Sequence, residues 1–112
     1  MKSIEDLPEK ERLALGELKL QIGREFANSF RLTLFGSKAR GDAEPDSDID
    51  ILVELDTPQI SLSEKRKLQR IAGAISLKSC VLICLLIVDR HTREEKGDYS
   101  IFQNIREEGI AL

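Results

Sequence analysis

The sequence predicts a small α/β or α+β domain in which a sheet of three to four strands packs against helices. Three patterns predict this class: an early helical stripe, a strand that alternates apolar and polar residues, and a continuous apolar run near the C-terminus. The expected order is helix, strand, strand, helix, strand, helix, which is typical of one sheet covered by helices. Because 112 residues hold one modest core, we expect a single domain over residues 1–112, with an N-terminal helix ahead of a core over residues 30–112.

The first half of the chain contains one helix and two strands. Apolar residues recur at three- and four-residue steps from Leu15 to Phe26, which predicts a helix over about residues 7–27. Residues 31–35 alternate and form the first strand. A loop rich in Asp follows over residues 41–47. The clearest strand is 48–55, where isoleucine, valine and leucine at the odd positions share one face.

The second half contains a helix, an apolar strand and a final helix. Ser61 followed three residues later by Glu64 has the form of a capping box, which marks the start of a helix. The run from Val81 to Val88 is apolar throughout, as expected of a strand covered on both faces. The capping-box pattern recurs at Thr92, and the last amphipathic helix is expected to end at Gly109.

Composition excludes several classes of protein. The net charge of −3 gives no general attraction to nucleic acid or to anionic membranes, so we expect neither partner. The longest apolar run is too short to cross a bilayer. Cys80 and Cys84 are too few for a zinc site and are best interpreted as reduced thiols in a cytoplasmic protein. A polyanionic ligand would therefore need a metal ion or a local basic patch.

A Gly-Ser turn at the end of the first predicted strand is a candidate phosphate site. Gly36 lets a phosphate approach the backbone, and Ser37 adds a hydroxyl to the unpaired N–H groups of the turn. Lys38 and Arg40 supply positive charge nearby. Alone, this pattern is weak and is more typical of an ordinary strand end.

Two carboxylates form the second candidate feature. Asp48 and Asp50 lie at positions i and i+2 of a strand, so they project from one face roughly 7 Å apart. That spacing allows both to reach one Mg²⁺ or a pair of ions, although a polar, solvent-facing edge would look the same. If the two strands are neighbours, the turn and the carboxylates share one end of the sheet. That arrangement suits phosphoryl or nucleotidyl transfer, in which positioning and charge neutralisation supply most of the catalysis.

Both features, embedded in LFGSKARGDAEPDSDIDILVEL, closely resemble the signature of the DNA polymerase β-like nucleotidyltransferase superfamily. More narrowly, the chain is similar to the minimal nucleotidyltransferase (MNT) proteins, whose C-terminal helix and tail resemble FQNIREEGIAL. The resemblance spans roughly residues 30–112. It implies a mixed-sheet nucleotidyltransferase fold and use of ATP and Mg²⁺. It also implies a HEPN-type toxin as partner. In such pairs the MNT protein is the antitoxin, and it often neutralises the toxin by attaching AMP to one of its tyrosines.

The resemblance assigns roles only to residues that match the motif. Those residues are Gly36, Ser37, Arg40 and Lys38 for nucleotide binding, and Asp48 and Asp50 for metal binding and catalysis. The acceptor substrate, the base preference and the oligomeric state stay open, and a homo-oligomer is one option.

The sequence departs from the superfamily at its third carboxylate, which normally lies on a neighbouring strand and activates the attacking hydroxyl. Our alignment places Leu82 there, with Cys84 next along the same face. Neither side chain is a general base or a hard ligand for Mg²⁺. Asp89 has the wrong parity unless a β-bulge shifts it, and Glu54 is about 13 Å along the strand from Asp50.

Two hypotheses therefore stand side by side. The first is an active nucleotidyltransferase that adenylylates a partner protein. The second is a catalytically weak, degenerate MNT domain that neutralises its partner by contact. A small-molecule nucleotidyltransferase of the antibiotic-modifying kind is disfavoured, because no second domain is present to form an acceptor pocket.

Overall fold

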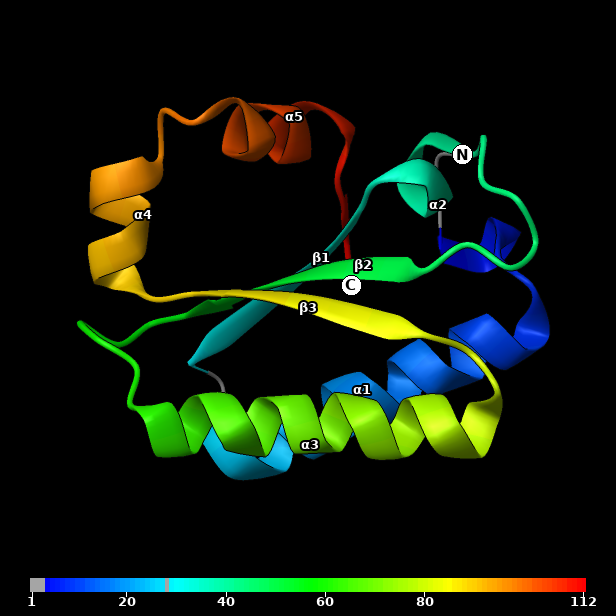
Figure 1. The fold of residues 1–112 in the computed structure, drawn as a ribbon, viewed down its shortest axis with the longest axis horizontal. Helices are drawn as coiled ribbons and strands as arrows, with labels where there is room; N and C mark the ends of the chain where they lie inside the picture. Colours follow the sequence, from blue (N-terminus) through cyan, green and yellow to red (C-terminus); the bar gives the residue numbers. More distant parts are fainter. Residues whose placement is uncertain (1–3, 28) are drawn as a thin grey trace.

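The computed structural model describes residues 4–27 and 29–112 and contains one four-stranded sheet with helices on both faces (Figure 1). In chain order the elements are η1 (Ile4–Asp6), α1 (Glu9–Phe26), β1 (Phe30–Phe35), α2 (Ser37–Arg40), β2 (Ile49–Leu55), α3 (Leu62–Ser79), β3 (Ile83–Val88), α4 (Arg90–Lys96), α5 (Ser100–Glu108) and β4 (Ile110–Ala111). The predicted class is confirmed, and the fourth strand is the two-residue β4. Within the described ranges, no helix is both long enough and apolar enough to cross a membrane.

The sheet is mixed, with strand order β3-β2-β1-β4. β1 runs antiparallel to both β2 and β4, whereas β2 and β3 run parallel. A parallel pair needs a crossover, and α3 supplies it. Phe35 at the end of β1 is the register partner of Asp50 near the start of β2. The turn after β1 and the beginning of β2 therefore lie at the same end of the sheet.

The main core lies between the sheet and the helices α1 and α3, which cover one face together (Figure 1). The alternation of β2 is confirmed, because Ile49, Ile51 and Val53 are at most 1% exposed and point into this core. The opposite face carries α4 and α5, and its smaller cluster contains Leu52 and Ile105. Burial of the odd residues of β2 thus turns its even residues, including Asp50, toward the second face.

Capping patterns predict helix starts at Ser61 and at Thr92, and the structure confirms the first. Ser61 Oγ accepts the Glu64 N–H at 3.1 Å, and the Glu64 carboxylate accepts the Ser61 N–H at 3.0 Å. The start predicted at Thr92 is wrong. Asp89 is the cap of α4, since its carboxylate accepts the Thr92 N–H at 2.7 Å. The final segment is also divided into α4 and α5 instead of forming one helix.

The apolar run of β3 is less covered than predicted. Its first and last residues, Ile83 and Val88, are buried, but the four between them are only half-buried. The reason is that β3 is the end strand of the sheet and has β2 on one side only. An apolar run indicates a strand with two contacted faces, but it does not indicate whether both edges are paired.

Candidate active site

The Gly-Ser turn and Asp50, near the start of β2, converge at one end of the sheet. Gly36 adopts φ +75°, a left-handed conformation that favours glycine. A Cβ atom built on Gly36 would collide with Oδ2 of Asp50. The Asp50 carboxylate therefore lies directly against the backbone of the turn, and any side chain at position 36 would push it away.

The turn is held in place by α2, which begins immediately after it. Ala39 and Arg40 both donate their N–H groups to the Gly36 carbonyl at 3.1 Å. Gly41 closes the helix at φ 86°, and its N–H donates to the Ser37 carbonyl at 3.0 Å. The N–H groups of Ser37 and Lys38 precede the first bond of the helix, so the helix supplies no acceptor for them. These backbone donors thus follow directly on the Gly36 backbone that Asp50 contacts, and Ser37 itself is half-buried.

The two aspartates differ in exposure. Asp48 is exposed, and Asp50 is half-buried. Burial, followed by the negative charge of Asp48, raises the pKa of Asp50, while the positive charge of Arg40 partly opposes the rise. A bound cation would relieve both effects that disfavour the charged form. Mg²⁺ is typically held by one or two carboxylates together with substrate phosphates, so this donor set fits the ion.

Cys84 is the β3 residue that lies beside the two aspartates, whereas Leu82 was expected at the position of the third carboxylate. It is the register partner of Asp50 across the parallel β2–β3 pair, and its Sγ lies 3.6 Å from Oδ2 of Asp48, to which it donates a hydrogen bond. Burial, and then the charge of Asp48, raise the pKa of the thiol. Leu82 is 55% exposed and brings no ligand. Across the described residues, no group of three or more His, Cys, Asp or Glu side chains is arranged to hold a metal ion.

Asp89 does not rescue the third position. It follows Val88, whose register partner is Glu54, so it lies at the far end of the sheet from Asp50. Its carboxylate accepts the N–H groups of Ile60 at 2.9 Å and of Thr92 at 2.7 Å. Burial alone would raise its pKa, but these hydrogen bonds outweigh that effect and hold the pKa at about 2. Asp89 is a structural residue.

The two basic residues of α2 have different surroundings. Lys38 is 5% exposed, and its Nζ lies 3.1 Å from Oε1 and 3.2 Å from Oε2 of Glu11 in α1. This arrangement gives no support to the phosphate contact expected of Lys38. Arg40 is exposed at the edge of the site, where it pairs with Asp42 at 3.3 Å and with Glu108 at 3.5 Å. The partner Glu11 was not foreseen, because it stands 27 residues before Lys38 and no local pattern joins them.

A small cavity of about 230 Å³ opens beside the turn, between the end of β1, α2 and α5. Its lining residues are Phe35, Gly36, Arg40, Ile101, Asn104, Ile105 and Glu108. Ligand pockets for drug-sized molecules usually exceed about 300 Å³, so this space can accept part of a nucleotide. Sequence reasoning missed the contribution of α5, since its residues lie far from the motif along the chain.

Comparisons with known proteins agree with this geometry. The chain matches the nucleotidyltransferase domain family over residues 15–111. It is 46% identical over 57 residues to a candidate protein adenylyltransferase from Methanocaldococcus jannaschii. That alignment covers 51% of this chain and 57% of the relative, so the chain spans little more than half of the relative's length.

Two solved structures share the fold at low sequence identity. A toxin–antitoxin complex with AMP-PNP has a TM-score of 0.58 at 16% identity, over 93% of this chain and 72% of that one. A candidate nucleotidyltransferase from Sulfolobus solfataricus has a TM-score of 0.54 at 17% identity, over 97% of this chain and 90% of that one. These similarities establish the fold, and the family match extends over most of the sequence. The chain therefore belongs to the nucleotidyltransferase domain family.

Proposed function

We propose that this chain binds Mg-ATP at the end of the sheet where β1 and β2 meet. The triphosphate lies against the backbone donors of the turn and the Ser37 hydroxyl, while Asp48 and Asp50 hold Mg²⁺. The observation that carries the proposal is the contact of the Asp50 carboxylate with the Gly36 backbone. It brings the phosphate-binding and carboxylate groups into one site, as transfer chemistry requires.

The reaction we propose is transfer of AMP to a hydroxyl group of a partner protein. The acceptor oxygen forms a bond to the α-phosphorus as the bond to pyrophosphate breaks, so the products are an AMP ester and pyrophosphate. Mg²⁺ held by Asp48 and Asp50 neutralises phosphate charge when bound. The turn orients the triphosphate. Arg40, exposed at the rim, adds positive charge toward the leaving pyrophosphate.

The partner that we propose is the toxin of a toxin–antitoxin pair, of the HEPN type. Support comes from the MNT resemblance, from the relative named as a candidate protein adenylyltransferase, and from the fold shared with a toxin–antitoxin complex. In this setting the chain is the antitoxin, and the modified hydroxyl belongs to the toxin.

A second function is favoured by one specific observation, the thiol of Cys84 beside Asp48. A protonated thiol does not remove a proton from the acceptor hydroxyl. That proton must then pass to water or to a group of the partner. If neither accepts it efficiently, the domain binds nucleotide but transfers slowly, and it neutralises its partner by contact.

Nucleotide binding is tested by calorimetric titration of the full chain with Mg²⁺ and a non-hydrolysable ATP analogue. Asp48→Asn is expected to weaken binding at least tenfold, because it removes one of the two proposed metal ligands. Asp46→Asn is the matched control, since it changes an exposed acid of the preceding loop. Equal affinities in both variants would remove Asp48 from the site.

Transfer is tested separately by incubating the chain with Mg-ATP and the presumed toxin and weighing the toxin by mass spectrometry. A gain of AMP that is lost in Asp48→Asn supports the transferase. No gain, with the toxin still inhibited by Asp48→Asn, supports neutralisation by contact.

A further inference from the structure

β3 leaves hydrogen-bonding groups of its backbone facing outward. The Ile49 N–H donates to the Leu82 carbonyl at 2.8 Å, which fixes the phase of the parallel ladder. Even-numbered residues of β3 therefore bond to β2, and odd-numbered residues face away from it. The Ile83 N–H accordingly donates to Ser76 Oγ at 3.0 Å instead of to β2. Leu85 and Ile87 then direct both N–H and C=O outward, where the described chain places no further strand.

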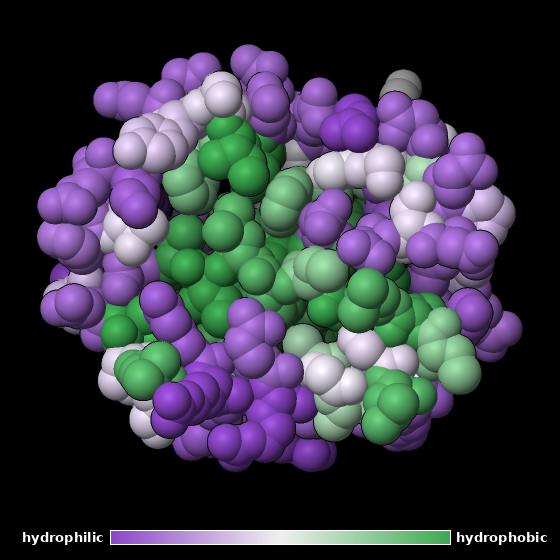
Figure 2. Space-filling model, viewed as in Figure 1, coloured by the Kyte–Doolittle hydropathy of each residue, from purple (hydrophilic) through white to green (hydrophobic). Residues whose placement is uncertain are grey.

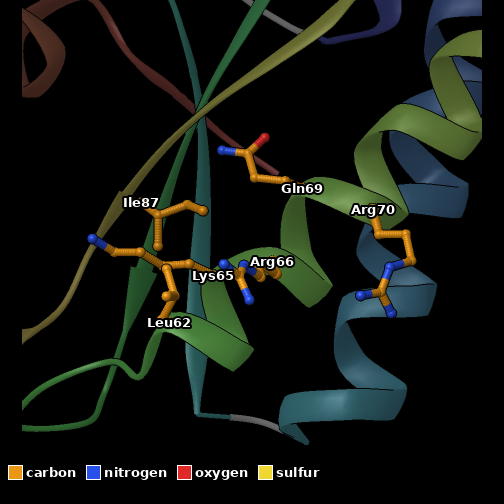
Figure 3. A pocket seen from close by; sticks show the side chains of 6 residues that line it. All are labelled: Leu62, Lys65, Arg66, Gln69, Arg70 and Ile87. Atoms are coloured by element: carbon orange, nitrogen blue, oxygen red, sulfur yellow. The ribbon is translucent and has the colours of Figure 1, made fainter.

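The edge of β3 is bordered by a groove on the side of α3. The groove has a volume of about 680 Å³ and is lined by Leu62, Lys65, Arg66, Gln69, Arg70 and Ile87. In the view of Figure 2, apolar side chains gather across the middle of the molecule, and the polar surface of α3 lies below them. Figure 3 shows Ile87 reaching toward α3, with Lys65 and Arg66 beside it and Arg70 extending from the other flank of the helix. The groove thus joins an apolar floor to a basic wall.

Among the described residues, the three cations of this wall have no partner. Lys65, Arg66 and Arg70 are exposed, and the described part of the chain offers their side chains no ion pair or hydrogen bond. Lys67, one turn away on the same helix, does pair, with Glu25 at 3.1 Å. Among the six charged residues of α3 only Glu64 is acidic, and it is engaged in the capping box. A locally basic groove on a chain of net charge −3 calls for an acidic occupant.

We propose that β3 receives an extended acidic segment of a partner protein as an added strand. Its backbone pairs with the outward groups of Leu85 and Ile87. Every second side chain of the added strand enters the groove, because successive side chains of a strand point to opposite faces. The carboxylates among them contact Lys65 and Arg66. This surface lies on the α3 side of the sheet, opposite the face that carries Asp50, and does not depend on nucleotide binding.

Other occupants fit the groove less well. A second copy of the chain would present the same β3 and a second basic α3, so the cations would again lack carboxylates. A single-stranded nucleic acid would satisfy charge, but the groove lining contains no aromatic side chain for base stacking and the strand edge would stay unpaired. An acidic peptide satisfies both the backbone and the charges.

The probe is a seven-residue peptide of alternating glutamate and valine, titrated into the ¹⁵N-labelled full chain and followed by NMR. We expect amide shifts at Leu85 and Ile87 and saturable binding. The double variant Lys65→Glu/Arg66→Glu should bind at least about tenfold more weakly, because two attractive contacts become repulsive. Lys10→Glu/Arg24→Glu carries the same charge change on exposed positions of α1 and should bind within about twofold of the wild type.

Strand addition makes a further demand that simple charge attraction does not. Two peptides test this, one N-methylated at its odd-numbered residues and one at its even-numbered residues. One of them should lose binding and the other should keep it, because only one of the two sets of peptide N–H groups faces β3. The proposal would be overturned if a lysine–valine peptide bound as tightly as the glutamate–valine peptide, or if the α1 control lost as much affinity as the Lys65→Glu/Arg66→Glu variant. It would also be overturned if methylation of the two alternate sets of residues weakened binding equally. Tighter competitive binding of oligothymidylate would overturn it as well. A dimer in the ultracentrifuge whose Leu85 and Ile87 amides resist hydrogen exchange would assign the edge to a second copy instead.

Discussion

Replacement of Lys38 by methionine should destabilise the chain strongly without touching the nucleotide. Lys38 follows the phosphate turn, but its side chain is buried and lies 3.1 Å from Glu11 in α1. One Glu11 oxygen, Oε1, accepts no hydrogen bond, so it depends on the ammonium charge alone. In Lys38→Met the Glu11 carboxylate stays buried without a cation. Breaking one partner of such a pair costs about 3–5 kcal/mol.

That loss is large against the total stability of a domain of this size, which is about 5–15 kcal/mol. The double variant Glu11→Leu/Lys38→Met removes both charges and should return to within about 2 kcal/mol of the wild type. The matched control is Lys67→Met. Lys67 and Glu25 also lie 3.1 Å apart, but their side chains are 47% and 44% exposed. Solvent screens that pair, so its loss should cost less than about 1 kcal/mol.

Urea unfolding gives the free energies of the variants, and calorimetry gives their affinity for Mg²⁺ with a non-hydrolysable ATP analogue. We expect the double variant to fold and to keep wild-type affinity. If it folds but loses affinity, Lys38 contacts phosphate and the assignment to α1 is wrong. If Lys38→Met costs no more than Lys67→Met, the reasoning from burial itself is refuted.

Three further variants test the rest of the site and its frame. Cys84→Asp, which restores a carboxylate on β3, should raise the rate of AMP transfer about 100-fold or more, whereas Cys84→Ser should not; a mass-spectrometric time course measures both. Asp50→Asn should raise Tm at pH 7 without metal, because folding raises the pKa of this carboxyl and so disfavours its charged form. That destabilisation is complete above the raised pKa and disappears below the ordinary value of 3.8. The increase in Tm should therefore vanish in acid. Asp89→Ala should cost about 2–4 kcal/mol in urea unfolding, because a buried and a part-buried N–H group lose their acceptor. Since the folded pKa of Asp89 is about 2, its stabilisation of the wild type should be complete above about pH 4 and be lost as the pH falls toward 2.

Local patterns predicted the elements that carry the site. The alternation of β2 predicted that Asp50 points away from the main core, because the odd residues of the strand are buried there. The capping box at Ser61 marked the start of α3. Both signals act within a few residues, so the sequence alone contains them. The convergence of Gly36 with Asp50 needed one further assumption, that the two strands are neighbours, and their antiparallel register confirms it.

Several features that local patterns did not predict involve contacts between distant segments. Lys38 and Arg40 are two residues apart, so a helix sends them to different faces, and only the position of α1 decides which of them is buried. The apolar run of β3 looks the same in a central strand as at an edge. The cap that Asp89 forms with the Thr92 N–H is local, but its second bond, to the Ile60 N–H, joins it to a residue 29 positions earlier. Such pairings depend on tertiary packing, which periodicity does not encode.

Cys84 links the two proposed functions through one atom. The thiol lies opposite Asp50 in the parallel β2–β3 pair and donates a hydrogen bond to Asp48. A carboxylate in its place would add one negative charge and one hard ligand, which are needed for proton removal more than for holding a triphosphate. On the proposed function, we therefore expect nucleotide binding and AMP transfer to be separable. If the chain transfers AMP as proposed, the proton of the acceptor hydroxyl must pass to water or to a group of the partner, and in the second case docking of the partner would be part of the catalytic step.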